Sequence, residues 1–104
     1  MSTVTEQTSD QRMENLRRAN IARLHGANVR RSIRRGETRL VEIVGDPLLE
    51  NQQIGPFVRA LPYVGDVAAR RALRGAEVSY DRPLRDVSLR SVEKILARLP
   101  ERHR

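Results

Sequence analysis

The stretch PFVRALPYVGDVAARRAL, residues 56–73, predicts two short helices joined by a tight turn. Pro62 must end the first helix, because proline lacks an N–H and disfavours helical backbone in the residue before it. The turn is then Pro62-Tyr63-Val64-Gly65, and Asp66 is the expected N-cap of the second helix. A glycine at a helix start lets another molecule approach the free N–H groups, which together with the helix dipole favour an anion such as phosphate. The alternative is an ordinary helical hairpin in which the glycine serves only the turn.

The composition indicates a nucleic acid as the partner. The chain has 104 residues, which suits a single domain, and its formal net charge is +7. All but one of its 20 basic residues are arginines. Arginine matches phosphate oxygens and guanine edges bidentately, although codon usage in a GC-rich genome also favours arginine over lysine. The excess of positive charge therefore carries the inference, and an acidic membrane surface is the less common alternative.

Several function classes lack the residues they would need. The chain has no cysteine, which excludes disulfides and cysteine-based zinc sites. His25 and His103 have no neighbours that suit a metal site or a nucleophile–base pair. No P-loop and no dinucleotide-binding glycine pattern is present. We therefore expect no enzymatic activity, no metal and no cofactor. No signal peptide or membrane-spanning run is visible, so we expect a cytoplasmic protein.

Caps and apolar periodicity divide the chain into three parts. Residues 1–8 are small and polar, and we expect a disordered tail. Residues 9–36 predict a long helix that is capped by Ser9 and closed by Gly36. The apolar stripe in its first half is thin, so we expect the helix to project from the body or to pack only in its second half. Residues 37–100 then form a compact domain.

The compact domain is expected to contain only helices and connectors. Thr38 is the predicted cap of a short helix, and Asp46-Pro47 should start a further turn. Polar residues 51–55 and residues 76–84 read as connectors. Ser88 should cap the last helix, which Pro100 ends and whose buried stripe comprises Leu89, Val92, Ile95, Leu96 and Leu99. No alternation typical of strands occurs with hairpin turns, so the fold class is all-α.

Basic residues gather in two places. The first group follows the turn, with Arg70, Arg71 and Arg74 on the second hairpin helix and Arg82, Arg85 and Arg90 on the linker and the start of the last helix. If the linker folds back beside the hairpin, Arg82, Arg85 and Arg90 flank the turn, and backbone donors beside arginines are the usual phosphate-binding footprint. Solubility is the alternative role, and Arg85 could instead pair with Asp81 or Asp86. The second group ends the long helix, where it is either a nucleic-acid surface or a solvated helix end, and comprises Arg30, Arg31, Arg34, Arg35 and Arg39.

Three blocks resemble the actinobacterial type of integration host factor in order and spacing. They read RRGETRLVEIV, VRALPYVGDVAARRAL and RPLRDVSLRSVEKIL, and the similarity runs from about Val29 to Leu99. The resemblance implies a long N-terminal helix, residues 9–36, followed by a helix-two-turns-helix domain, residues 37–100. It also implies a small, largely monomeric nucleoid protein that binds double-stranded DNA with little sequence preference. Such a protein would bend or compact DNA and assist phage integrase.

The family's DNA-binding turn matches Pro62 to Gly65 of this chain. Its later basic positions match Arg82, Arg85 and Arg90. The predicted DNA-binding set is therefore Pro62, Tyr63, Val64, Gly65, Asp66, Val67, Arg70, Arg82, Arg85 and Arg90. Asp66, Pro83 and Asp86 depart from the family pattern, and these departures bear on affinity and on how deeply a groove is engaged.

Two other functions stay open at this point. One is an RNA- or ribosome-associated helical module, since similar hairpins serve there. The other is an adaptor whose basic surface meets an acidic protein. A large exposed apolar patch would favour the adaptor, whereas we expect the apolar residues of this chain to be used up in the core.

Overall fold

The computed structural model describes residues 8–99. Its elements are the helices α1 (Ser9–Arg34), α2 (Ile54–Arg59), α3 (Asp66–Gly75) and α4 (Leu89–Ala97) and the 3₁₀-helices η2 (Leu40–Ile43) and η3 (Leu84–Asp86). Within residues 8–99 the backbone forms no strand, only an isolated antiparallel bridge between Gln53 and Pro83. The all-α prediction is confirmed. The predictions for residues 1–7 and for His103 lie outside the described residues. The last helix ends at Ala97, before the predicted stop at Pro100.

Helix α1 begins with a capping box. Thr8 Oγ1 accepts a hydrogen bond from Gln11 N (3.1 Å), and Gln11 Oε1 accepts one from Thr8 N (2.9 Å). The N-cap is thus Thr8, which the sequence placed in the tail, and the predicted cap Ser9 is the first helical residue. At the other end, Gly36 has the left-handed φ of +77° that the predicted helix stop requires.

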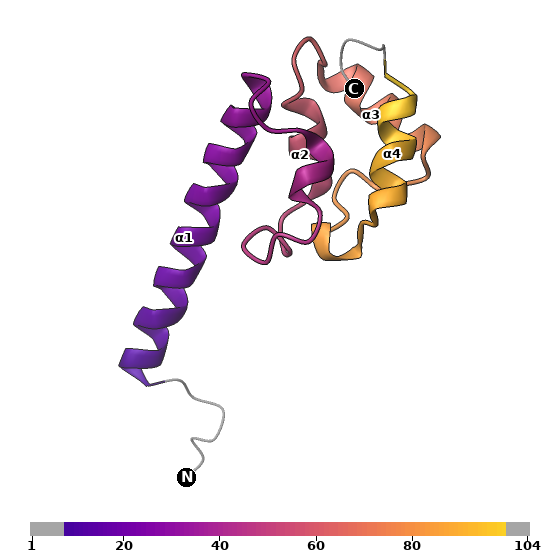
Figure 1. Cartoon of the computed structure of the whole chain (residues 1–104). Helices are drawn as coiled ribbons and strands as arrows, with labels where there is room; N and C mark the ends of the chain where they lie inside the picture. The colour runs from indigo at the N-terminus through magenta and orange to yellow at the C-terminus, as the bar shows by residue number, and fades with distance from the viewer. Residues whose placement is uncertain (1–7, 100–104) are drawn as a thin grey trace.

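The first half of α1 projects from the body (Figure 1), and the molecule measures 58 × 26 × 21 Å. Only Gly26 and Ile33 of this helix are buried. Met13, Leu16 and Leu24 are each about 60% exposed. The predicted projection is confirmed, but the expectation that the apolar residues are used up in the core is wrong for α1.

Two polar contacts hold the second half of α1 to the body. Gln52 Nε2 donates to the Ala22 carbonyl (2.8 Å), and the Gln52 amide occupies the space that a Cβ on Gly26 would need. Gly26 therefore allows the Gln52 side chain to approach the backbone of this helix closely. His25 Nε2 lies 2.8 Å from Asp46 Oδ2, and this hydrogen bond lowers the pKa of Asp46 below its ordinary 3.8.

The short helix predicted after α1 is η2, and its N-cap is Arg39 rather than Thr38. Thr38 Oγ1 instead lies 2.6 Å from Ser32 Oγ, so the two hydroxyls hydrogen-bond the segment back to α1. Asp46 Oδ1 accepts from Leu48 N (3.0 Å). Asp46 therefore caps the residues after it, as predicted, although residues 47–51 form turns and not a regular helix.

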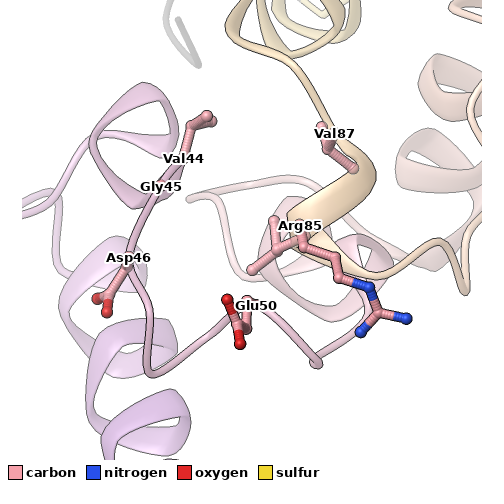
Figure 2. A pocket seen from close by; sticks show the side chains of 7 residues that line it. Val44, Gly45, Asp46, Glu50, Arg85 and Val87 are labelled. Carbon is pink, nitrogen blue, oxygen red and sulfur yellow. The ribbon is translucent and has the colours of Figure 1, made fainter.

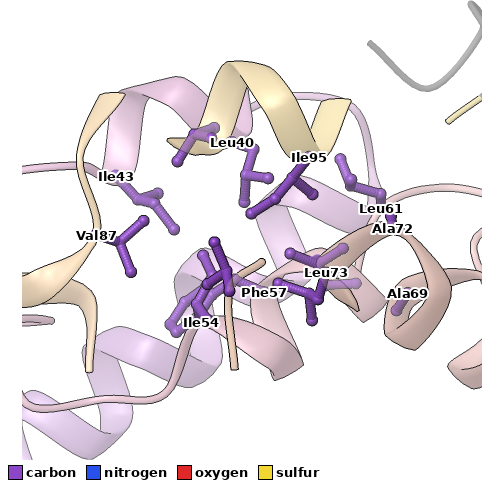
Figure 3. Close-up of a cluster of buried hydrophobic side chains, with 14 of the residues drawn as sticks. Leu40, Ile43, Ile54, Phe57, Leu61, Ala69, Ala72, Leu73, Val87 and Ile95 are labelled. Carbon is purple, nitrogen blue, oxygen red and sulfur yellow. The ribbon is translucent and has the colours of Figure 1, made fainter. Parts of the chain in front are cut away.

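The core lies between η2, α2, α3 and α4 (Figure 3). Phe57 is the only phenylalanine and is fully buried. Helix α4 packs on α3 and η2, and α2 packs on α3 and α1. The largest fully buried side chains are Phe57, Ile33, Leu40, Leu49, Ile54, Leu73, Ile95, Val58 and Val92. Leu, Ile and Val thus fill the core around one aromatic ring.

Helix α4 follows its prediction closely. Ser88 is the N-cap, and its Oγ accepts from Ser91 N (3.1 Å). Val92, Ile95 and Leu99 are buried as expected. Leu89 is the exception, because this member of the predicted buried stripe is 50% exposed.

The linker after α3 folds back onto the start of α2. Ile54 N donates to the Arg82 carbonyl (2.9 Å), and Gly55 N donates to the Tyr80 carbonyl (2.8 Å). These bonds satisfy two of the N–H groups that a helix start leaves without partners. Ile54 and Gly55 are therefore buried helical residues, whereas the sequence assigned them to a polar connector.

Gly55→Ala should destabilise the fold by about 1–3 kcal/mol, because the added Cβ would overlap the Tyr80 ring. Alanine's better helix propensity, about 1 kcal/mol, would offset only part of this. Urea unfolding followed by circular dichroism measures the difference. Gly65→Ala is the matched control: its Cβ meets nothing within 4 Å, so it loses only the preference for glycine before a helix start, and its midpoint should stay well above that of Gly55→Ala. An unchanged midpoint for Gly55→Ala would contradict the packing described here.

Candidate nucleic-acid interface

The turn between α2 and α3 presents apolar side chains to solvent. Tyr63 is 83% exposed, more than any other large apolar residue in the described range, and Val67 is 68% exposed. Val64 is buried and anchors the turn, with its N–H donating to the Leu61 carbonyl (3.1 Å). Tyr63 has a left-handed φ of +64°, which is uncommon for a residue other than glycine. The predicted turn thus exists as an apolar tip on a strongly basic chain.

Gly65 and not Asp66 is the N-cap of α3. Gly65 has φ −91° and ψ −178°, an extended conformation that any residue adopts, so the turn itself does not require glycine here. Nothing lies within 4 Å of the position of an added Cβ. Glycine therefore leaves bare backbone at the surface, at the positive end of a ten-residue helix.

Asp66, the first residue of α3, bridges two arginines. Arg70 Nε donates to both carboxylate oxygens of Asp66 (3.0 and 3.1 Å), and Arg59 Nη1 lies 4.0 Å from Oδ1. The Arg70 guanidinium also stacks on the Tyr80 ring at 4.2 Å from its centroid. The structure therefore links Asp66 and Arg70, which the sequence predicted as site residues, to Arg59 and Tyr80, which it missed. The spacing of four residues could have shown the Asp66–Arg70 pair, but no local signal identifies Tyr80.

Arg82 and Arg85 lie at the end of α2 that is remote from the turn. The linker does fold back, but it pairs with residues 50–55, which precede α2, whereas the turn follows α2. The expected flanking of the turn by these arginines is therefore wrong. Arg85 Nη1 donates to the side-chain oxygen of Asn51. Its pairing with Asp81 or Asp86 is likewise not found among the residues described.

A recess of about 280 Å³ beside Arg85 is unsuited to phosphate. Figure 2 shows the Glu50 carboxylate at the recess, whereas the Asp46 carboxylate and the Arg85 guanidinium point in opposite directions, away from each other. Its lining comprises Val44, Gly45, Asp46, Glu50, Leu84, Arg85 and Val87.

The last arginine of the first basic group, Arg90, is exposed in the first turn of α4.

The second basic cluster is mostly on the surface. Arg30 is the exception, because it is partly buried with its guanidinium 5.4 Å from the centroid of the buried Phe57 ring. The four exposed members are Arg31, Arg34, Arg35 and Arg39. Arg31 donates to Asn28 (3.0 Å), and Arg35 lies 3.8 Å from Glu37. These contacts leave a basic surface at the end of α1.

Other kinds of site find little support in the described part of the chain. Within residues 8–99 there is no group of three or more acidic, histidine or cysteine side chains that could hold a metal ion. None of the helices described is both long enough and apolar enough to cross a bilayer. His25, the one histidine within residues 8–99, forms a hydrogen bond with Asp46.

Comparison with known proteins establishes the fold. No family model matches the sequence, and no curated protein matches it. Among solved structures, the chain matches a structure of sIHF bound to an 8-bp palindromic DNA. The TM-score is 0.67 at 21% sequence identity, over 75% of this chain and 96% of that chain. The two chains share an integration-host-factor-like fold, and the actinobacterial type stays a prediction from the sequence.

Proposed function

We propose that this chain is an architectural protein that binds double-stranded DNA through the turn between α2 and α3. The observation that carries the proposal is the exposed tip formed by Tyr63 and Val67 beside the bare backbone of Gly65. Backbone N–H groups at a helix start bind phosphate, and apolar side chains next to them can wedge against base steps in a minor groove. The fold shared with sIHF, which was solved on DNA, supports the same interpretation.

One duplex can meet both ends of α2. Helix α2 has six residues and is therefore about 9 Å long; the turn follows its C-terminal end, and the linker that bears Arg82 and Arg85 pairs with residues at its N-terminal end. Each strand of duplex DNA carries one phosphate per about 3.4 Å of helix axis, so two to three phosphates span a length of about 9 Å. In this arrangement Gly65 anchors phosphate, and Arg82 and Arg85 reach the same duplex further along. Arg90 at the start of α4 would add a phosphate contact.

The proposed role is structural and not catalytic. Contacts to phosphates carry no sequence information, so binding should show little sequence preference. Groove insertion by apolar side chains or arginines favours bent DNA, so the protein would bend or compact its target. We place it as a monomer in the nucleoid, where the bent DNA would serve phage site-specific integration. An RNA-associated role is the alternative, and a comparison of affinities for duplex DNA and structured RNA distinguishes the two.

Affinity for duplex DNA should fall steeply as salt is raised. If about three to five phosphates are neutralised, the logarithm of the binding constant should fall with the logarithm of salt concentration with a slope of about −3 to −5. Fluorescence anisotropy on labelled duplex DNA, single strands and structured RNA measures it. A slope near zero on the duplex, or tighter binding to structured RNA at every salt concentration, would contradict the proposal.

Gly65→Val should weaken duplex binding by at least about tenfold, or about 1.4 kcal/mol. The reason is steric, because the new side chain would cover the backbone that phosphate must approach. The fold should stay intact, since the backbone conformation suits valine and the Cβ has open space. Ala97→Val, on the exposed surface of α4, is the control for an added apolar side chain. Equal affinities of Gly65→Val and wild type would show that the turn is only structural.

Arg85→Ala should reduce the DNA bend angle at matched occupancy, because its guanidinium would no longer reach the groove. Energy transfer between dyes on the two ends of a duplex measures the angle. Arg23→Ala is the matched control, because Arg23 on α1 also donates to an asparagine, Asn20 at 2.8 Å. If all three proteins produce one angle, Arg85 does not act on DNA shape.

A further inference from the structure

We infer that Asp66 is an internal competitor of DNA phosphate, which sets the affinity of the proposed interface. This inference rests on the proposed function. Asp66 is the first residue of α3, directly after Gly65 and at the positive end of the helix, and its side chain is 43% exposed. A carboxylate and a phosphate compete for the same donors at a helix start. The free protein therefore presents an interface that already holds an anion.

The Asp66 carboxylate pairs with two arginines that would otherwise be available to DNA phosphates. Arg70 donates to both Asp66 oxygens, and Arg59 approaches one of them at 4.0 Å. Their side chains are 52% and 59% exposed, so the pairs are screened by water and weak. A polyanion can therefore displace Asp66 from them. The competition lowers affinity without blocking binding.

Arg70 is held in place by a contact that does not depend on Asp66. Its guanidinium lies over the Tyr80 ring, and that ring packs against Gly55 at the start of α2. When a phosphate replaces the carboxylate, the stacking keeps Arg70 beside the turn. Release of Arg70 from Asp66 thus leaves a positioned cation and not a mobile one.

Asp66→Asn is the direct test. Removal of the charge should tighten binding to a 20-bp duplex about two- to fivefold, since an exposed pair contributes up to about 1 kcal/mol. Bound DNA displaces Asp66 from Arg59 and Arg70 in the wild type as well, so the number of neutralised phosphates should stay the same and the salt slope should change by less than about 0.9. In an Arg70→Gln background the gain from Asp66→Asn should shrink, because part of it acts through Arg70.

Glu14→Gln is the matched control for net charge. Glu14 also bridges two arginines, Arg17 at 3.4 Å and Arg18 at 3.3 Å, but it lies on the projecting half of α1. It should give a smaller gain than Asp66→Asn and leave the salt slope unchanged. If wild type binds the duplex and Asp66→Asn gains no more than Glu14→Gln, the competition is overturned while the proposed function stands. If neither wild type nor Asp66→Asn binds duplex DNA, both proposals fall.

Discussion

The fold depends on the hydrogen bonds between the linker after α3 and the first residues of α2. A six-residue helix is far too short to be stable alone in water, because few hydrogen bonds compensate the cost of ordering its first turn. The Tyr80 and Arg82 carbonyls supply partners to the Gly55 and Ile54 N–H groups. Only with these in place can Ile54 and Phe57 remain buried and carry the rest of the core.

The same linker joins the core to the candidate interface. Tyr80 uses its backbone to hold α2 and its ring to hold Arg70 of α3. Tyr80 thereby contacts both α2 and α3, the two helices on either side of the turn. The turn can then support a left-handed Tyr63 without a glycine at that position, because the flanking helices fix its ends. An exposed tip of this kind needs a rigid support, and a residue seventeen positions later in the chain provides part of it.

The sequence predicted what depends on near neighbours. The cap at Ser88, the stop at Gly36, the turn at residues 62–65 and the projection of α1 all follow from local chemistry or from a simple apolar stripe. Contacts between distant residues were missed, as with Gln52 filling the place of a Cβ on Gly26, or Tyr80 beneath Arg70. The position of Arg82 and Arg85 was wrong for the same reason. The sequence indicated that the linker after α3 could fold back. The end of α2 that it contacts, however, is decided by the N–H groups at the start of α2, which lack partners within the helix.

The positions of the two tyrosines have a spectroscopic consequence. The chain contains no tryptophan, only two tyrosines and one weakly absorbing phenylalanine, so its near-ultraviolet absorption and intrinsic emission arise almost entirely from Tyr63 and Tyr80. Tyr63 is the exposed tip of the turn, and Tyr80 is the stacking partner of Arg70. One chromophore therefore lies in the turn and the other in the linker that supports α2 and α3, and the long helix α1 contributes none. Native optical signals of this protein report on the environment of the turn and its support, with no label attached and almost no background from the remaining chain.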